Sequence, residues 1–441
     1  AWQAPAAAPA TAPAPLRWQA RNTTRVETWR YFEPKPGGGD PDYAFVANRL
    51  LFTLDWRRPR FEVGGGLQYV QFGGLPTTAS GPGALGTGAL YFDHAGRPDS
   101  RQVYLRTLQL RLKNLLPGLD VQMGRFGYTS GAESPSGDPK IEAVKRQRLD
   151  ARLIGEFEWS LYQRAFDGVR LDVSRPQWHA TAAAFRPTQG GFEEQAGHPL
   201  HGVGAAAFTF TLEPSAQVRH TDWQGFVYLY DDTRSVSARP DNTLLPASAI
   251  DVGITSVGTS LVGAYPVGEG QFDTLVWLVL QRGQWYGQDH RAGAVAAERG
   301  YQWTKRPWRP WLRAGWFHST GDADAGDDTH GTFFQVLPTG RKYSLSTTYN
   351  LMNLTELFGQ ALLRPRADVG VRLDVHGLRL TNAADLWYSG SGATQSSGTI
   401  FGFAGRRSNG SNELGTIAEG AADWLVLRRV AGLVGVGIIV G

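Results

Sequence analysis

The chain has 441 residues, of which 41% are hydrophobic and 12% aromatic, and this apolar content excludes a disordered protein. Cysteine is absent, which excludes disulfides, zinc–cysteine sites, iron–sulfur clusters and cysteine nucleophiles. The formal net charge of +4 is small for this length and predicts no nucleic-acid partner.

The first fifteen residues are rich in proline and alanine, so residues 1–15 are predicted to form an extended linker. Residues 16–441 show no second linker and are predicted to form a single domain. No charged and apolar leader precedes the linker, which predicts that the numbering begins after removal of a signal peptide.

Short segments in which apolar and polar residues alternate follow the linker. Leu108–Lys113 and Leu119–Met123 alternate without a fault, and Val169–Val173 and Val371–His376 repeat the pattern. Such alternation is typical of a strand with two different faces. A soluble sandwich turns its apolar face inward, whereas a membrane barrel turns it outward to lipid and lines its lumen with polar side chains.

The spacing of the segments favours the membrane barrel. Short connections such as Asn114–Gly118 alternate with long ones rich in Gly, Asp and Ser, namely Gly74–Arg101, Thr320–Thr332 and Ser389–Asn412. Aromatic residues cluster near segment ends, as interfacial girdles require. At about 24 residues per strand and connection, the chain is predicted to be all-β, a transmembrane antiparallel barrel of about 18 strands with an aqueous lumen.

Two segments depart from the strand pattern. Lys140–Tyr162 contains good helix formers without period two, and we predict a short helix or folded loop that enters or caps the lumen. Gly81–Gly86 fits the dinucleotide-binding pattern G-x-G-x-x-G, but a loop precedes it and more glycine follows. A flexible loop is therefore predicted there.

Basic residues on the polar strand faces are the candidate binding residues. An arginine-lined pore attracts anions and slows cations. Alternatively, these cations pair with acids such as Asp55 and Glu62, although Leu108–Lys113 contains no local acid. The predicted pore-lining set is Arg49, Arg111, Lys113, Arg125, Arg152, Arg170, Asp172, Arg372 and Asp374.

Other chemistry has little support in the sequence. Carboxylates clustered on one loop are weak candidates for Ca²⁺ binding, namely Asp322, Asp324, Asp327 and Asp328. No other cofactor is predicted, and the scattered histidines show no compact metal spacing. No nucleophile–base constellation is evident, so the protein is predicted not to be an enzyme.

Several motifs, in this order, resemble the alginate-export family of bacterial outer-membrane β-barrels: residues 166–171, 320–322, 337–343, 371–380 and 385–388. The resemblance implies an eighteen-stranded barrel with an electropositive lumen that passes an anionic uronate polymer. It also implies that Arg125, Arg152 and Arg170 place positive charge near the constriction, and that Asp167 and Gly168 form a turn after the lumenal segment.

We therefore predict a channel in the outer membrane of a Gram-negative bacterium, surrounded by lipid and lipopolysaccharide. It would pass anionic polysaccharide or small anionic solutes by passive diffusion. The alternative is a structural barrel that anchors or sheathes a partner protein, with the N-terminal linker as a tether to a periplasmic or envelope partner.

Overall fold

The fold is taken from a computed structural model, which describes residues 15–30, 42–78, 86–214, 220–340, 343–345, 348–427 and 430–440. The predicted linker and most of the predicted Gly81–Gly86 loop lie outside the described residues. The described residues contain no helix long and apolar enough to cross a membrane.

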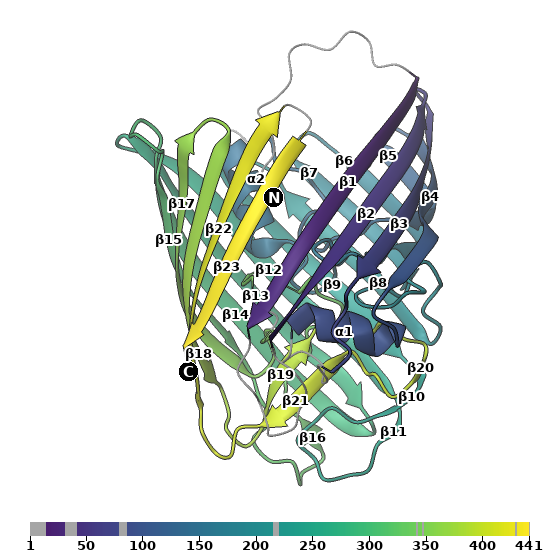
Figure 1. The fold of residues 1–441 in the computed structure, drawn as a ribbon. Helices are drawn as coiled ribbons and strands as arrows, with labels where there is room; N and C mark the ends of the chain where they lie inside the picture. Colours follow the sequence, from purple (N-terminus) through teal and green to yellow (C-terminus); the bar gives the residue numbers. More distant parts are fainter. Residues whose placement is uncertain are drawn as a thin grey trace.

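One sheet of eighteen strands dominates the described part of the chain (Figure 1). Seventeen of its strands form an antiparallel meander, and the two-residue β16 (Thr329–His330) pairs in parallel with β14. The meander consists of β1 (Leu16–Arg30), β2 (Asp42–Arg57), β3 (Phe61–Gly73), β4 (Ser100–Leu116), β5 (Leu119–Phe126), β6 (Phe166–Ser174), β7 (Trp178–Pro187), β8 (Val203–Leu212), β9 (Thr221–Asp232), β12 (Val252–Val267), β13 (Gly270–Trp285), β14 (Gln288–Trp303), β15 (Trp311–Ser319), β17 (Leu354–Arg366), β18 (Val369–Leu380), β22 (Glu413–Leu427) and β23 (Val430–Val440).

The sheet curls so that its first and last strands both face the viewer in Figure 1. No hydrogen-bonded register joins β1 to β23 within the described residues. The predicted all-β antiparallel architecture of about eighteen strands is confirmed.

The two faces of the sheet differ as the alternation predicts. In β2, Leu50, Phe52 and Leu54 are exposed and point outward, whereas Phe45 and Arg49 are buried on the opposite face. Leu278 and Leu280 of β13 repeat this outward exposure. An apolar exterior is stable only against lipid, and the polar positions therefore line the lumen.

The long connections all lie at one end of the sheet. They carry α1 (Gly86–Ala95), a small sheet of β10 (Ser235–Ala238), β11 (Ser248–Ala249) and β20 (Ser397–Gly398), and a hairpin of β19 (Leu386–Gly390) and β21 (Phe403–Arg407). These elements lie at the bottom of Figure 1. Outer-membrane barrels have short periplasmic turns and long extracellular loops, so this end faces outward from the cell.

The connection between β5 and β6 folds into the lumen. Asp138 accepts hydrogen bonds from the backbone N–H groups of Lys140 and Ile141 and so begins α2 (Pro139–Val144). The π-helical turn η1 (Lys145–Leu149) follows, and the chain is irregular from Asp150 onward. The prediction of a short helix or folded loop in the lumen is confirmed. The sequence did not predict α1, because glycine and single aromatic residues mask its helical pattern.

This lumenal segment, residues 127–165, packs against strands on more than one side of the barrel. Tyr128, Ile141, Val144 and Ile154 are buried in one core cluster with inward side chains of β7, β9 and β13, including Trp277. Residues 156–161 of the segment contact β1–β4. The segment therefore fills part of the lumen and leaves Arg17 and Arg21 of β1 exposed.

Candidate functional site

Most of the predicted pore-lining cations lie on the inner face and are paired with acids. Arg111 contacts Asp120 at 2.8 Å, and Lys113 contacts Glu62 at 2.8 Å. Neighbouring strands supply both acids, which is why Leu108–Lys113 could lack one of its own. Paired charges lend the lumen little net field.

The same pairing recurs further along the sheet. Arg170 contacts Asp172 at 2.8 Å and also donates to the backbone carbonyl of Glu133 in the lumenal segment. Arg372 forms an ion pair with Asp374 and donates to the backbone carbonyl of Tyr343. Both arginines thus connect the barrel wall to segments that enter the lumen, and their role as pore-lining groups stays a prediction.

Arg125 lies on the other face of the sheet. It stands opposite Leu108, an exposed lipid-facing residue, and it pairs with Asp167 at 2.6 Å. Its position has the parity of Val121 and Met123, so the alternation places it outward, against the expectation from the resemblance. Asp167 and Gly168 are residues of β6 and form no turn, which corrects that expectation too.

Arg152 belongs to the lumenal segment and is buried. Its guanidinium lies 3.3 Å from Glu298 of β14, which also binds Arg148 and Arg313 at 3.1 Å each. These four side chains are at most 2% exposed. This buried cluster anchors the segment to the wall rather than presenting charge to a permeant.

The inner faces of β1 and β2 differ from this pattern. Arg49 donates to the backbone carbonyls of Ser160, at 2.8 Å, and Glu158, at 3.3 Å, and it contacts no carboxylate of the described residues. Arg17 and Arg21 make no ion pair with any described residue, and both are exposed. Arg25 pairs with Glu27 at 2.9 Å.

Register places these arginines in one column, which we call the β1–β2 arginine column: Arg17, Arg21, Arg25 and Arg49. Arg49 stands opposite Thr23, between Arg21 and Arg25 on the neighbouring strand. Successive β1 arginines are four residues apart, or roughly 13 Å along the strand. Of the column, sequence reasoning found only Arg49. The sequence signal for this column was the repeat of arginine every four residues in β1, on the face that does not carry the exposed Trp18 and Val26.

A cavity of about 640 Å³ opens among the long connections. We call it the vestibule. Arg25 donates to the backbone carbonyl of Trp159, a vestibule residue, so the column and the vestibule adjoin. The rings of Phe157 and Trp159 lie 5.3 Å apart. Aromatic side chains and neutral polar side chains share the lining, among them Phe157, Trp159, Phe192, Tyr349, Asn350, Phe403, Gln335, Thr339 and Ser391.

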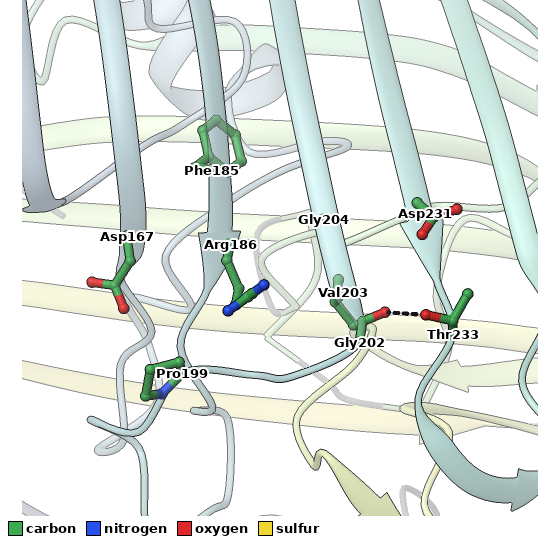
Figure 2. Close-up of a pocket in the computed structure, with 9 residues that line it drawn as sticks. All are labelled: Asp167, Phe185, Arg186, Pro199, Gly202, Val203, Gly204, Asp231 and Thr233. Carbon is green, nitrogen blue, oxygen red and sulfur yellow. Dashed lines mark hydrogen bonds between the residues drawn. The ribbon is translucent and has the colours of Figure 1, made fainter.

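A second hollow, of about 530 Å³, lies on the outer face near the long connections (Figure 2). Phe185 and Val203 are buried there, and the intervening positions Arg186 and Gly204 point outward with Asp231. The hollow therefore opens on the outer face of the sheet and not into the lumen.

The predicted calcium loop lies among the long connections. Burial, together with the nearby carboxylates of Asp385 and Asp327, raises the pKa of Asp322 to about 6. Among the described residues, the one group of three convergent metal-ligand side chains is Asp374, His376 and Glu419, and it contains none of the four loop aspartates. A cation at the loop therefore stays a prediction.

Comparison with known proteins supports the fold and identifies a family. Residues 144–440 match the family described as alginate export. The structure is similar to OccK9 (OpdG) of Pseudomonas aeruginosa, with a TM-score of 0.60, 10% identity and coverage of 96% of this chain and 92% of that chain. None of the curated proteins matches the chain in sequence.

Two further solved structures share the fold at low identity. A BenF-like porin from Pseudomonas fluorescens Pf-5 has a TM-score of 0.59 and 9% identity, with coverage of 96% of this chain and 93% of that chain. OccK2 (OpdF) of Pseudomonas aeruginosa, solved in complex with glucuronate, has a TM-score of 0.56 and 7% identity, covering 96% of this chain and 91% of that chain.

Proposed function

The chain belongs to the alginate export family of outer-membrane β-barrels, and on that premise we propose that its lumen passes anionic sugars, as uronate polymers or single uronates, by diffusion. The β1–β2 arginine column is the observation that carries this proposal. It places two arginines without a carboxylate partner among the described residues, and a third bound only to carbonyls, on one inner wall.

The column attracts anions for a simple electrostatic reason. A guanidinium stays charged at every physiological pH and binds carboxylates through two parallel hydrogen bonds. In water, one such charge stabilises an anion about 5 Å away by roughly 0.8 kcal/mol, or about fourfold in local concentration. Because the interactions are weak and repeated along the axis, an anion can enter and also leave, as conduction requires.

The vestibule complements the column at the extracellular end. An aromatic ring offers an apolar face to the C–H face of a sugar, while hydroxyl and amide groups bond to its hydroxyls. Trp159, Phe192, Thr339 and Asn350 supply both kinds of contact around one cavity. A permeant that has both a sugar ring and a carboxylate would therefore contact the vestibule with its ring and the β1–β2 arginine column with its carboxylate.

The similar fold of OccK2, which was solved in complex with glucuronate, supports a uronate as the first anion to test. The carboxylate of glucuronate would contact the column, and its ring would contact the vestibule.

The test is the reversal potential of the purified protein in a planar bilayer under a salt gradient, with and without a polyuronate. We expect anion selectivity and block by the polymer. In the variant R17S/R21S the anion-over-cation ratio should fall, because each guanidinium removed lowers the local anion concentration roughly fourfold and raises the local cation concentration by about the same factor. The matched control R101S/R282S removes two exposed outward arginines and should keep the wild-type ratio.

An unselective conductance, or equal ratios in the two double variants, would contradict the proposal. Absence of any conductance from a folded barrel would also contradict it and would favour a barrel that holds a partner protein.

A further inference from the structure

Strands β17, β18 and β22 adjoin one another (Figure 1), and a buried polar cluster lies on their inner face. Asp374 of β18 stands directly opposite Gln360 of β17 on one side and Glu419 of β22 on the other. His376 follows two positions along β18, on the same face. Asp374, His376 and Glu419 are 2%, 0% and 5% exposed, so the cluster is closed to bulk water.

The ring of His376 is oriented by a second carboxylate. Its Nδ1 lies 2.6 Å from Oε1 of Glu356, and the hydroxyl of Tyr349 donates to the same oxygen at 3.2 Å. An ionised carboxylate only accepts, so Nδ1 carries the proton of this hydrogen bond. Histidines that bind metals almost always donate their second nitrogen to a carboxylate in this way.

The other ring nitrogen of His376 has no hydrogen-bond partner among the described residues, although it is fully buried. It lies 3.8 Å from Oε2 of Glu419, which is too long for a hydrogen bond. Two ligand atoms held about 2.1 Å from a tetrahedral zinc ion are roughly 3.4 Å apart, so a small closure would bring both into coordination distance. A ligand oxygen of Asp374 completes a set whose atoms all lie within 4.8 Å of one another.

Further contacts orient the two carboxylates. Asp374 accepts from the amide of Gln360 at 2.8 Å and pairs with Arg372. Glu419 accepts from the hydroxyl of Ser344 and from the backbone N–H of Leu345. A carboxylate offers about four lone-pair sites, so a carboxylate that accepts hydrogen bonds can also bind a metal ion.

We propose that Asp374, His376 and Glu419 bind one divalent transition-metal ion, with Zn²⁺ as the best match. An imidazole ligand favours zinc and its neighbours over calcium and magnesium, which prefer oxygen ligands alone. Glu356 is the positioning residue that fixes the histidine ring.

The ion would reach the site from the vestibule, and its binding would stabilise part of the vestibule lining. Ser344 and Tyr349 line the vestibule, and they contact Glu419 and Glu356 respectively. Residues 343–345 and 348–351 are therefore attached to the cluster at two points. A bound ion would hold this part of the vestibule lining against the wall of β17, β18 and β22.

The test is a titration of the full-length barrel, refolded in detergent after chelation, with Zn²⁺ and with Co²⁺ as a spectroscopic probe. We expect one high-affinity ion per chain and a Co²⁺ absorption band typical of a nitrogen and oxygen ligand set. H376Q should lose at least about 100-fold in affinity, and E356Q about 10- to 100-fold, because the oriented ring is lost. The control H201Q changes an exposed histidine and should bind as the wild type does.

Circular dichroism of each variant shows whether the barrel has folded, and E356Q keeps all three ligands should H376Q fail to fold. The proposal is overturned if the wild type binds no zinc, if H376Q or E356Q binds as tightly as the wild type, or if Ca²⁺ competes equally with Zn²⁺. The first of these results would mean that a proton, and not a metal, lies between His376 and Glu419. None of these readouts depends on what the lumen conducts.

Discussion

Two walls of this barrel carry arginine on their inner faces, and they differ in what each guanidinium contacts. On the wall from β4 to β7, Arg111 and Arg170 contact aspartates of their own or a neighbouring strand. On β1 and β2, Arg17 and Arg21 have no ion-pair partner among the described residues, and Arg49 contacts only carbonyls. The same residue type is therefore paired with acids on one wall and leaves exposed charge on the other.

The lumenal segment accounts for part of this division. It packs on the wall that includes β7, β9 and β13, where buried charges require partners because desolvation is expensive. It also contacts β1 and β2, where Arg49 is 8% exposed and bonds to carbonyls of the segment. Arg17 and Arg21 are exposed, so water solvates them without a carboxylate.

The largest expected effect is on the buried cluster at Glu298. E298Q removes the charge that Arg148, Arg152 and Arg313 share, and the loss of one partner from a buried pair typically destabilises by about 3–5 kcal/mol. Denaturant unfolding in detergent measures this, with the exposed E413Q as control. A change below about 1 kcal/mol would show that water reaches the cluster and that the two walls are alike.

Charge reversal at Arg21, on the inner face of β1, should change ion selectivity and not stability. R21E removes one positive charge and adds a negative one, which disfavours an anion about 5 Å away by about 1.6 kcal/mol and lowers the local anion concentration roughly 15-fold. The unfolding free energy should stay within about 0.5 kcal/mol of the wild type, because Arg21 is exposed. Reversal potentials measure the first value, and the effect should shrink in concentrated salt. If the effect of R21E on the reversal potential persisted at high salt, Arg21 would have to lie away from water.

Removal of the whole ion pair Arg111–Asp120, on the wall from β4 to β7, should have little effect on selectivity or stability. R111Q/D120N removes one cation and one anion from side chains that are 40% and 22% exposed. Such pairs contribute about 0–1 kcal/mol, and the net charge is unchanged. Both the reversal potential and the unfolding midpoint should therefore match those of the wild type. A clear loss of anion selectivity would show that Arg111 acts on the permeant despite its partner.

The smallest effect concerns Asp322, a buried carboxylate that forms no ion pair with a cation among the described residues. Because burial raises the pKa of Asp322 to about 6 from an ordinary value of 3.8, its folded environment favours the protonated form. The loop Thr320–Thr332 should be most stable below pH 4 and should lose that contribution as the pH rises through 6. Hydrogen exchange, corrected for its intrinsic pH dependence, should show this change in the wild type and in D328N, but not in D322N. An unchanged profile in D322N would assign the pH dependence to another group.

Much of the fold could be predicted from local patterns. Period two in Leu108–Lys113 and Val371–His376 predicted strands with two faces, and the lengths of the connections predicted which end carries the loops. The lumenal segment was recognised because Lys140–Tyr162 lacks that period. The helix α1 was not, since propensity in its glycine-containing sequence is weak and packing near Phe45 and Phe72 stabilises it.

The candidate sites were less predictable. The alternation in residues 119–125 places Arg125 on the outer face, whereas the family resemblance suggested the lumen. The register of Arg125 opposite the lipid-facing Leu108 decides between these two expectations. The column on β1 was visible as a spacing of four but could not be separated from paired arginines. The group around His376 combines residues from three strands, and no local spacing brings Glu419 beside Asp374.

The sequence by itself determined the class of fold, because alternation, turn chemistry and connection length are local properties of the chain. It also determined which side chains can share a face. Only the tertiary structure decided which charges are neutralised, because an ion pair depends on the strand that happens to be adjacent and on where the lumenal segment excludes water. That pairing, and not the number of arginines, separates the anchoring wall from the wall that we propose conducts anions.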